Sequence, residues 1–292
     1  MRTPIRCARP AVFYSSQVRV FRLKLMTWLT QPILFIVLLL MHPNCFAVYA
    51  PVINHLCADS RLYCVRVPHG QSWSRMFPDP TLRDTVMRIN HMNTRLIPGM
   101  LLAIPNDKSN TNFMAYAPFA SHIAASGTRT IIFDPKLTAW AAYDVSGNLV
   151  YWGPGSGGKS WCSDIRRSCR TVVGVFRMYE KRGRDCFSTK FPMPNGGAPM
   201  PYCMFFKGGF AMHASNTVPG YNDSHGCIRI FFEDAQWLNQ HFVTIHATRV
   251  IVLPYGAQTN KKYTTVKTQD QLDDDEQDDT TYYTEDEDMD EE

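Results

Sequence analysis

The residue whose surroundings point most clearly to chemistry is Cys227, within the stretch SHGCIRI at Ser224–Ile230. This stretch contains His225, and a second histidine, His213, lies eleven residues before Ser224. A cysteine in such a place can be half of a disulfide, a metal ligand or a nucleophile. Only a small part of a free thiol is ionised at neutral pH, so a nucleophilic cysteine needs a nearby base. His213 on a strand and Cys227 after a returning loop can meet as such a pair.

Two neighbours of Cys227 would assist its attack on a carbonyl group. Gly226 lets the backbone come close to a substrate, and the amides near Gly226 and Cys227 can stabilise an oxyanion. Arg229 would lie on the same strand face as Cys227 and can bind a carboxylate. The alternative for Arg229 is a surface salt bridge.

A zinc site is the alternative interpretation of the same residues. His213, His225 and Cys227 could supply three ligands, and Asp223 a fourth. The sequence lacks the C-x-x-C and H-x-x-x-H spacings that are typical of zinc sites. We therefore expect a nucleophile, with no metal and no other cofactor.

A glycine-rich stretch, GPGSGGKS at Gly153–Ser160, matches the phosphate-loop pattern G-x-x-x-x-G-K-[ST]. Such a loop needs a helix directly after it, because the N-terminal amides of that helix hold the phosphates. Here the chain continues with WCSDIRRSC, which is typical of a disulfide-closed loop. We therefore expect a glycine-rich hairpin end and no nucleotide.

The N-terminus predicts export. Six basic residues precede the apolar run Ile33–Met41, and the first 47 residues contain no acidic residue. Cys45–Ala47 offers a cleavage point, so residues 1–47 are predicted to be a signal peptide. The run is shorter than the roughly 20 residues of a membrane span, which leaves an uncleaved anchor as the weaker alternative. Met26 is a second candidate start.

Seven cysteines follow the signal peptide, and oxidising compartments preserve disulfides. Six of them form local couples, although the sequence alone leaves many connectivities open. Short loops favour the pairs Cys57–Cys64, Cys162–Cys169 and Cys186–Cys203. Cys227 is then the unpaired thiol.

The net charge of +4 hides a strong asymmetry, because 14 of the 26 acidic residues lie in Asp270–Glu292. The remaining Met1–Gln269 holds all 30 basic and 12 acidic residues, a net charge of +18. Such a body favours an anionic polymer, while plain solubility is the alternative. Residues 257–292 form an acidic tail with too little apolar surface to fold. Its partner, if it has one, is unknown.

Patterns along the chain predict two folded parts after a leader at 48–61. Residues 62–106 carry a strand, two short helices and a closing strand, which together make a small α+β unit. A polar linker at 107–127 follows. Residues 128–256 carry several short strands and one clear helix, FEDAQWLNQH, which is typical of a β-rich sandwich or barrel.

The stretch from His213 to Arg229 resembles the catalytic signature of L,D-transpeptidases, the YkuD-type domain. In that family a histidine is followed, about a dozen residues later, by S-H-G-C, a hydrophobic residue and Arg or Asn. IIFDPKLTAWAAYDVSGNLVYW, GSGGKS, TVVGVFRM and FEDAQWL resemble further family landmarks in order. Val172 replaces the usual proline. The resemblance implies a mainly β protein whose catalytic domain, at 128–256, is a β-sandwich.

The resemblance also implies a transferase acting on peptidoglycan stem peptides. Cys227 would form a thioester with the third residue of a stem and release the terminal D-alanine. An amine would then accept the acyl group, giving a cross-link or anchoring a protein. His213 would be the base, and His225, Gly226 and Cys227 would shape the oxyanion site. The implied substrate-binding set is Arg229, Ser224 and Ala214. Within this set, a structural role suits Ser224. The backbone carbonyl of Ala214 would orient His213.

Residues 62–106 resemble a lysin-motif (LysM) module, which binds glycans containing N-acetylglucosamine. The landmarks are Tyr63, Gly70, Ser72, Asn90, Pro98-Gly99 and Ile104-Pro105, with GQS in place of the usual G-D-T/S. Together the resemblances imply an exported enzyme of a bacterial periplasm or cell envelope. Its partners would be stem peptides and glycan strands, and not nucleic acid.

Two alternatives stay open. With water as acceptor, the same chemistry makes an L,D-carboxypeptidase. A protein that keeps the fold without turnover would be a non-catalytic wall-binding protein. The proline-rich stretch from Cys186 to Cys203 stands where the family has a variable lid. We expect its disulfide to hold this lid over the cleft, with a stabilised surface loop as the alternative.

Overall fold

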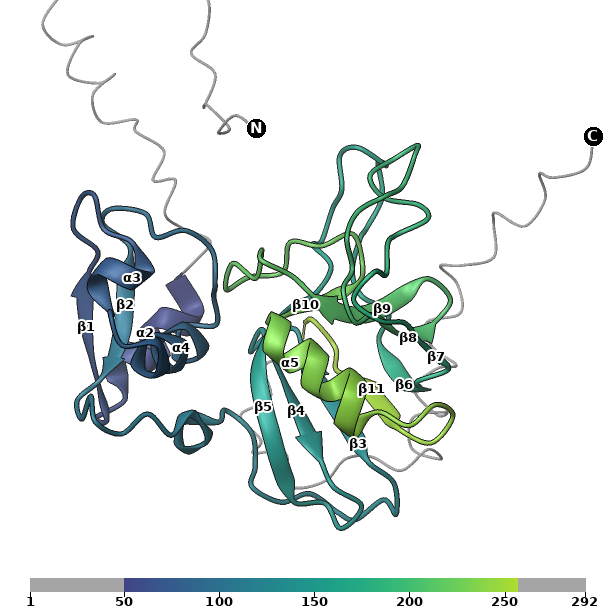
Figure 1. The fold of residues 1–292 in the computed structure, drawn as a ribbon, viewed down its shortest axis with the longest axis horizontal. Helices are drawn as coiled ribbons and strands as arrows, with labels where there is room; N and C mark the ends of the chain where they lie inside the picture. Colours follow the sequence, from purple (N-terminus) through teal and green to yellow (C-terminus); the bar gives the residue numbers. More distant parts are fainter. Residues whose placement is uncertain (1–49, 257–292) are drawn as a thin grey trace, which may run out of the picture. The chain divides into compact units, whose positions relative to one another are not determined.

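The computed structural model describes residues 50–256, which are drawn in colour in Figure 1. The predicted signal peptide at 1–47 and the predicted acidic tail at 257–292 lie outside the described residues. Within 50–256, no helix has both the length and the apolar character that crossing a bilayer requires.

The first folded part is a two-stranded antiparallel sheet with two helices inserted between its strands. Its elements are β1 (Leu62–Arg66), α3 (Trp73–Met76), α4 (Pro80–Ile89) and β2 (Leu101–Pro105). α4 begins after Asp79, whose carboxylate accepts a 2.8 Å hydrogen bond from the Thr81 amide. This strand–helix–helix–strand order is the one that the sequence pattern predicts for residues 62–106.

A helix that the sequence pattern does not predict precedes this unit, within the predicted leader at 48–61. α2 (Ala50–Ala58) is linked to β1 by the disulfide between Cys57 and Cys64, and Ile53 packs against Leu62. A helix of nine residues is marginal on its own in water. Its stability therefore comes from the disulfide and the apolar contacts, which a local sequence pattern does not reveal.

The second folded part is built on one nine-stranded sheet with the order β6-β11-β3-β4-β5-β10-β9-β8-β7. β10 runs parallel to β9 and β11 parallel to β3, and the other neighbours are antiparallel. The strands are β3 (Thr130–Asp134), β4 (Ala139–Tyr143), β5 (Leu149–Ser156), β6 (Gly174–Arg177), β7 (Glu180–Lys181), β8 (Met204–Lys207), β9 (Phe210–Ala214), β10 (Ile228–Ile230) and β11 (Arg249–Val252).

The sheet curls so that its two halves enclose one core. Phe176 in β6 and Phe206 in β8 belong to opposite ends of the strand order, yet their ring centroids are 5.6 Å apart. Phe133, Trp140 and Met212 are fully buried in this core and come from β3, β4 and β9. The layers of the predicted β-sandwich are therefore halves of a single sheet, and the protein is mainly β (Figure 1).

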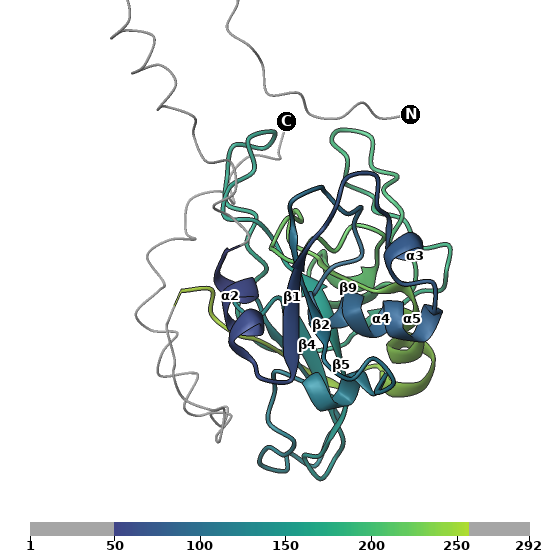
Figure 2. The ribbon, with the colours of Figure 1, turned by 90° about the vertical axis from the view of Figure 1, so that its left-hand side faces the viewer.

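Between β10 and β11 the chain forms α5 (Phe232–Trp237) and the π-helical turn η2 (Leu238–Phe242), where the sequence predicts a helix at 232–241. α5 contacts β9, the strand that ends with His213 and Ala214. Asp234 of α5 forms an ion pair with Arg88 of α4 at 2.7 Å, and α4 lies in front of α5 in the view of Figure 2.

The segment that the sequence predicts as a linker, 107–127, contains a short 3-10 helix, η1 (Phe113–Tyr116). Trp152 in β5 donates a 3.0 Å hydrogen bond from its indole nitrogen to the Phe113 carbonyl. The Phe113 ring also lies 5.3 Å from the Tyr151 ring, in an edge-to-face arrangement. This segment is therefore packed on the sheet over part of its length.

Candidate active site

β9 and β10 bring the predicted pair of residues to one place. The two strands are parallel neighbours, and their register sets Arg229 opposite His213. Cys227 directly precedes β10 and is two residues from Arg229, so their side chains point to the same face. His213, Cys227 and Arg229 all line a single cavity.

His213 is a buried, neutral imidazole. Its Nδ1–H donates a 2.9 Å hydrogen bond to the Ala214 carbonyl, and this is the ring's only hydrogen bond to another described residue. Burial lowers the pKa of His213 to about 4, and the positive charge of Arg229 acts in the same direction. At neutral pH, Nε2 therefore carries a lone pair that can accept a proton. Ala214 orients the ring through its backbone, as the sequence predicts.

Cys227 is the free cysteine among residues 50–256. Its thiol donates a weak 3.6 Å hydrogen bond to the Gly209 carbonyl. Burial raises the pKa of Cys227 above the ordinary value for a thiol. The resting group is therefore a thiol and not a thiolate, and it has to lose its proton as it reacts.

Ser224 fixes the turn that carries the thiol. Its hydroxyl donates a 2.5 Å hydrogen bond to the Cys227 carbonyl and accepts a 3.0 Å hydrogen bond from the Gly226 amide. Because the side chain is almost fully buried and its hydroxyl is engaged on both sides, Ser224 serves the backbone geometry. This agrees with the structural role that the sequence favours.

Gly226 is required by the same turn. Its φ of +127° lies in a region that side chains with a Cβ rarely adopt, and a Cβ here would stand 2.8 Å from a ring carbon of Phe210. The Thr171 hydroxyl donates a 2.7 Å hydrogen bond to the Gly226 carbonyl. Both backbone groups of Gly226 are therefore hydrogen-bonded, its amide to Ser224 and its carbonyl to Thr171.

His225 points to a partner that the sequence analysis did not find. Its Nε2 lies 2.7 Å from a carboxylate oxygen of Asp164, and its ring lies 4.8 Å from that of Phe191. The hydrogen bond from His225 holds the pKa of Asp164 below its usual range. Asp164 is 61 residues away in sequence, inside the WCSDIRRSC loop, so no local pattern connects it to the motif.

Arg229 lies at the wall of the cavity without a close counterion among residues 50–256. The nearest acidic group with which it pairs is Asp223, at 4.0 Å, and the Arg229 side chain is 23% exposed. An arginine so placed can form a short, charge-assisted hydrogen bond with an incoming carboxylate.

The cavity has a volume of about 540 Å³ and is lined in part by the predicted lid. The lid is closed at its base by the disulfide between Cys186 and Cys203. The lid residues that line the cavity are Phe187, Ser188, Thr189, Lys190, Phe191, Ala198, Pro199 and Met200. The disulfide therefore anchors a wall of the cavity, and the stretch is more than a surface loop.

The remaining cysteines are paired as the short loops predict, Cys162 with Cys169 and Cys57 with Cys64. Within residues 50–256, the one group of potential metal ligands close enough to share an ion is Cys162, Cys169 and His225. Its two sulfur atoms are bonded to each other. The zinc set considered from the sequence, with His213 and Cys227, does not form such a group in this part of the chain.

The stretch that matches a phosphate loop supports the motif turn. β5 ends at Ser156, whose hydroxyl donates a 2.7 Å hydrogen bond to the Tyr221 carbonyl. Gly158 forms a parallel bridge with Ser224, and a Cβ there would overlap the Cys169 carbonyl. In place of a helix, this stretch leads into the loop that Cys162 and Cys169 close.

Comparisons with known proteins identify the family. The model of the L,D-transpeptidase catalytic domain (YkuD) matches residues 65–252, well over half of the chain, and begins within β1. No curated protein matches the sequence.

Solved structures of L,D-transpeptidases also match. The enzyme from Xylanimonas cellulosilytica is 24% identical with a TM-score of 0.41, and the match covers 53% of this chain and 72% of that one. The protein from Stackebrandtia nassauensis is 18% identical with a TM-score of 0.39, covering 51% and 65%. LdtMt1 in complex with imipenem is 20% identical with a TM-score of 0.37, covering 43% and 59%. This chain thus spans less than two thirds of the length of the last two.

Proposed function

Because the chain belongs to the L,D-transpeptidase catalytic-domain family, which consists of cysteine-dependent acyltransferases of the cell wall, we propose that Cys227 forms a thioester with a peptidoglycan stem tetrapeptide and passes it to an amine. The observation that carries this proposal is the shared cavity, in which a free thiol, a neutral imidazole and an open guanidinium line the same space.

The proposed reaction has two steps. The sulfur of Cys227 attacks the carbonyl carbon of the third stem residue while its proton passes to Nε2 of His213. The bond to the terminal D-alanine breaks, and His213 returns the proton to that leaving amine. An acceptor amine then attacks the thioester carbonyl, which forms a new amide bond and releases the thiol.

The neutral state of His213 supports the role of base. A neutral ring at pH 7 can accept the thiol proton, and the bond from Nδ1 to the Ala214 carbonyl keeps Nε2 as the accepting nitrogen. Backbone amides near Gly226 and Cys227 would stabilise the tetrahedral oxyanion. Arg229 would bind a carboxylate of the stem peptide, because its own counterion is 4.0 Å away.

The experiment that tests this function is product analysis with purified stem tetrapeptides. We expect cross-linked dimers from the wild type and none from Cys227→Ala. Retained turnover in Cys227→Ala would refute the assignment of the nucleophile.

The L,D-carboxypeptidase alternative differs only in its acceptor. Trimmed tripeptides without dimers would show that water, and not an amine, takes the acyl group. If the wild type binds wall material and leaves it unchanged, the protein is a non-catalytic wall-binding protein.

We also propose that residues 62–106 bind glycan strands as a LysM module and that the protein is exported. The strand–helix–helix–strand order supports the first proposal, and three disulfides support the second. Sedimentation of the purified protein with wall glycan that lacks stem peptides tests the first proposal, and fractionation of cells that express the full chain tests the second. Failure to sediment would leave the module without a glycan ligand.

A further inference from the structure

The base and the nucleophile are joined by one segment, residues 214–226, whose two ends are held by the curled sheet. At the first end, the Ser215 amide donates a 2.9 Å hydrogen bond to the Ile230 carbonyl. At the other end, the Ser156 hydroxyl accepts a 3.1 Å hydrogen bond from the Asp223 amide, and the Ser224 amide donates to the Gly157 carbonyl at 3.0 Å.

The middle of this segment is held by the first folded part instead. Asn93 forms three hydrogen bonds with it, each 2.9 Å long. Its Nδ2 donates to the Ser215 carbonyl, its Oδ1 accepts from the Val218 amide, and its own amide donates to the Val218 carbonyl. Met92 continues the contact as an antiparallel bridge to Pro219. In the described part of the chain, residues 216–220 hydrogen-bond only to Asn93 and to the adjacent Ser215.

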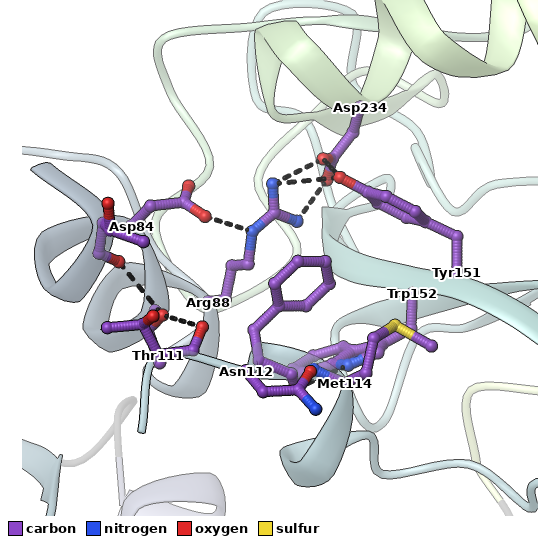
Figure 3. Close-up of polar contacts among 11 residues, drawn as sticks. Asp84, Arg88, Thr111, Asn112, Met114, Tyr151, Trp152 and Asp234 are labelled. Carbon is purple, nitrogen blue, oxygen red and sulfur yellow. Dashed lines mark hydrogen bonds and ion pairs between the residues drawn. The ribbon is translucent and has the colours of Figure 1, made fainter. Parts of the chain in front are cut away.

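The chain directly before Asn93 is anchored to the second folded part. Five residues before it, Arg88 near the end of α4 forms a two-pronged ion pair with Asp234 of α5, with distances of 2.7 and 3.0 Å (Figure 3). Between them, His91 Nδ1 donates a 2.6 Å hydrogen bond to the Leu137 carbonyl. Arg88, His91 and Asp234 are buried. Residues 88–91 are therefore fixed to the second folded part directly before Asn93.

Ser215 and Thr217, which follow His213 directly, line the same cavity as the thiol. Asn93 does not line it, so this side chain acts on the cavity only through the segment that it holds. Val218, which meets both the amide and the side chain of Asn93, is fully buried.

We propose that Asn93 is a positioning residue for the transfer reaction, because it fixes the segment that sets His213 relative to Cys227. The inference rests on the proposed function. It makes residues 62–106 part of the catalytic unit as well as a candidate glycan-binding module.

The test compares Asn93→Ala with Asn106→Ala. Asn106 belongs to the same folded part and also donates a 2.8 Å side-chain hydrogen bond, but to Ser60 at the surface and away from the segment. Acylation by imipenem is followed as a function of imipenem concentration, with thermal unfolding as a check of the fold. We expect the maximum acylation rate to fall about tenfold in Asn93→Ala, because small misplacements of reacting groups are costly. The half-saturating concentration should change less than twofold, and Asn106→Ala should resemble the wild type.

Asn93→Asp covers the case in which Asn93→Ala does not fold. It keeps the acceptor for the Val218 amide but sets a charged oxygen against the Ser215 carbonyl in place of the donor, so the maximum rate should fall in this variant as well. A folded Asn93 variant with an unchanged maximum rate would overturn the proposal. An effect confined to the half-saturating concentration would also overturn it, because Asn93 would then influence the binding of imipenem and not the reaction step.

A second readout does not depend on the reaction. The Nδ1–H of His213 is protected by its bond to Ala214, and its NMR signal should shift or exchange faster in Asn93→Ala. An unchanged signal would overturn the positioning role. If wild-type protein is not acylated at all, the proposed function fails, and this signal still decides whether Asn93 positions His213.

Discussion

Two arginines show how differently this protein uses the same side chain. Arg88, where the first folded part meets the sheet, is 3% exposed and donates to Asp84 at 2.7 Å and to both carboxylate oxygens of Asp234 (Figure 3). Arg229, in the cavity, is 23% exposed and reaches Asp223 only at 4.0 Å. The guanidinium of Arg88 is paired with carboxylates of the protein itself, while that of Arg229 can pair with a ligand in the cavity.

The histidines repeat this contrast. His91 and His213 are both buried, and burial lowers the pKa of each to about 4. The His91 ring meets the Leu137 carbonyl and the Thr138 hydroxyl, on the side where the first folded part docks. The His213 ring meets only the Ala214 carbonyl and borders the cavity. Burial alone therefore does not mark a reactive group, and an unused polar atom facing a cavity is the better sign.

The largest effect should come from breaking the satisfied pair. Asp234→Asn removes the buried counterion of Arg88 and leaves it only the partly exposed Asp84, and breaking a buried pair typically costs about 3–5 kcal/mol. We expect the free energy of unfolding in urea to fall by that amount. Glu180→Gln, which breaks the exposed pair with Arg182, should cost less than about 1 kcal/mol. Equal losses in the two variants would show that burial does not make the Arg88–Asp234 pair more important to stability than an exposed pair.

Removal of the base should act on the reaction and spare the fold. His213→Ala should lower the rate of acylation by imipenem about a hundredfold, since general bases typically contribute at least that much. The unfolding temperature should change little compared with this loss. His122→Ala, at an exposed histidine, is the control and should keep the wild-type rate. An unchanged rate in His213→Ala would place the base elsewhere.

The two buried histidines should make stability depend on pH. Each has a native pKa of about 4, while the unfolded value is about 6.5. As the pH falls below about 6.5, the unfolded state takes up protons that the native state does not, so the stability present above pH 6.5 is lost. Between pH 6.5 and 5 we expect each histidine to lower the free energy of unfolding by roughly 1–2 kcal/mol.

Urea unfolding of the wild type and of His91→Gln across this range measures the effect. The loss of stability over this range should be smaller in the variant by about 1–2 kcal/mol, the share of one histidine. An equal pH dependence in the two proteins would mean that burial does not keep His91 unprotonated in the native state.

The smallest effect should come from the open arginine. Arg229→Ala removes one charge-assisted contact with the substrate, which is worth about tenfold in the stem-peptide concentration needed for half-maximal rate. The fold should be unaffected, because the protein itself makes little use of this guanidinium. Arg66→Ala, on β1, serves as the control. Steady-state kinetics with stem tetrapeptides measure this concentration. An unchanged value in Arg229→Ala would show that Arg229 does not contact the substrate.

Sequence patterns predicted the parts of the site that are local. The short spacing from Ser224 to Arg229 requires one turn and one strand, so the thiol, the glycine and the arginine could be placed together. Short disulfide loops were equally predictable, because the paired cysteines are close along the chain.

Contacts between distant segments could not be predicted in this way. Arg88 and Asp234 are 146 residues apart, and His225 and Asp164 are 61 apart. Each depends on how two separately formed elements pack, which no spacing encodes. The packing of residues 88–93 on the segment between base and nucleophile belongs to the same class.

The most direct test of Cys227 as the nucleophile is the intact mass of the purified protein after incubation with imipenem, a β-lactam whose ring a reactive thiol can open. We expect a single covalent adduct on the wild type and none on Cys227→Ala. A folded wild-type protein without an adduct, or an adduct that persists in Cys227→Ala, would contradict the assignment of Cys227 as the nucleophile.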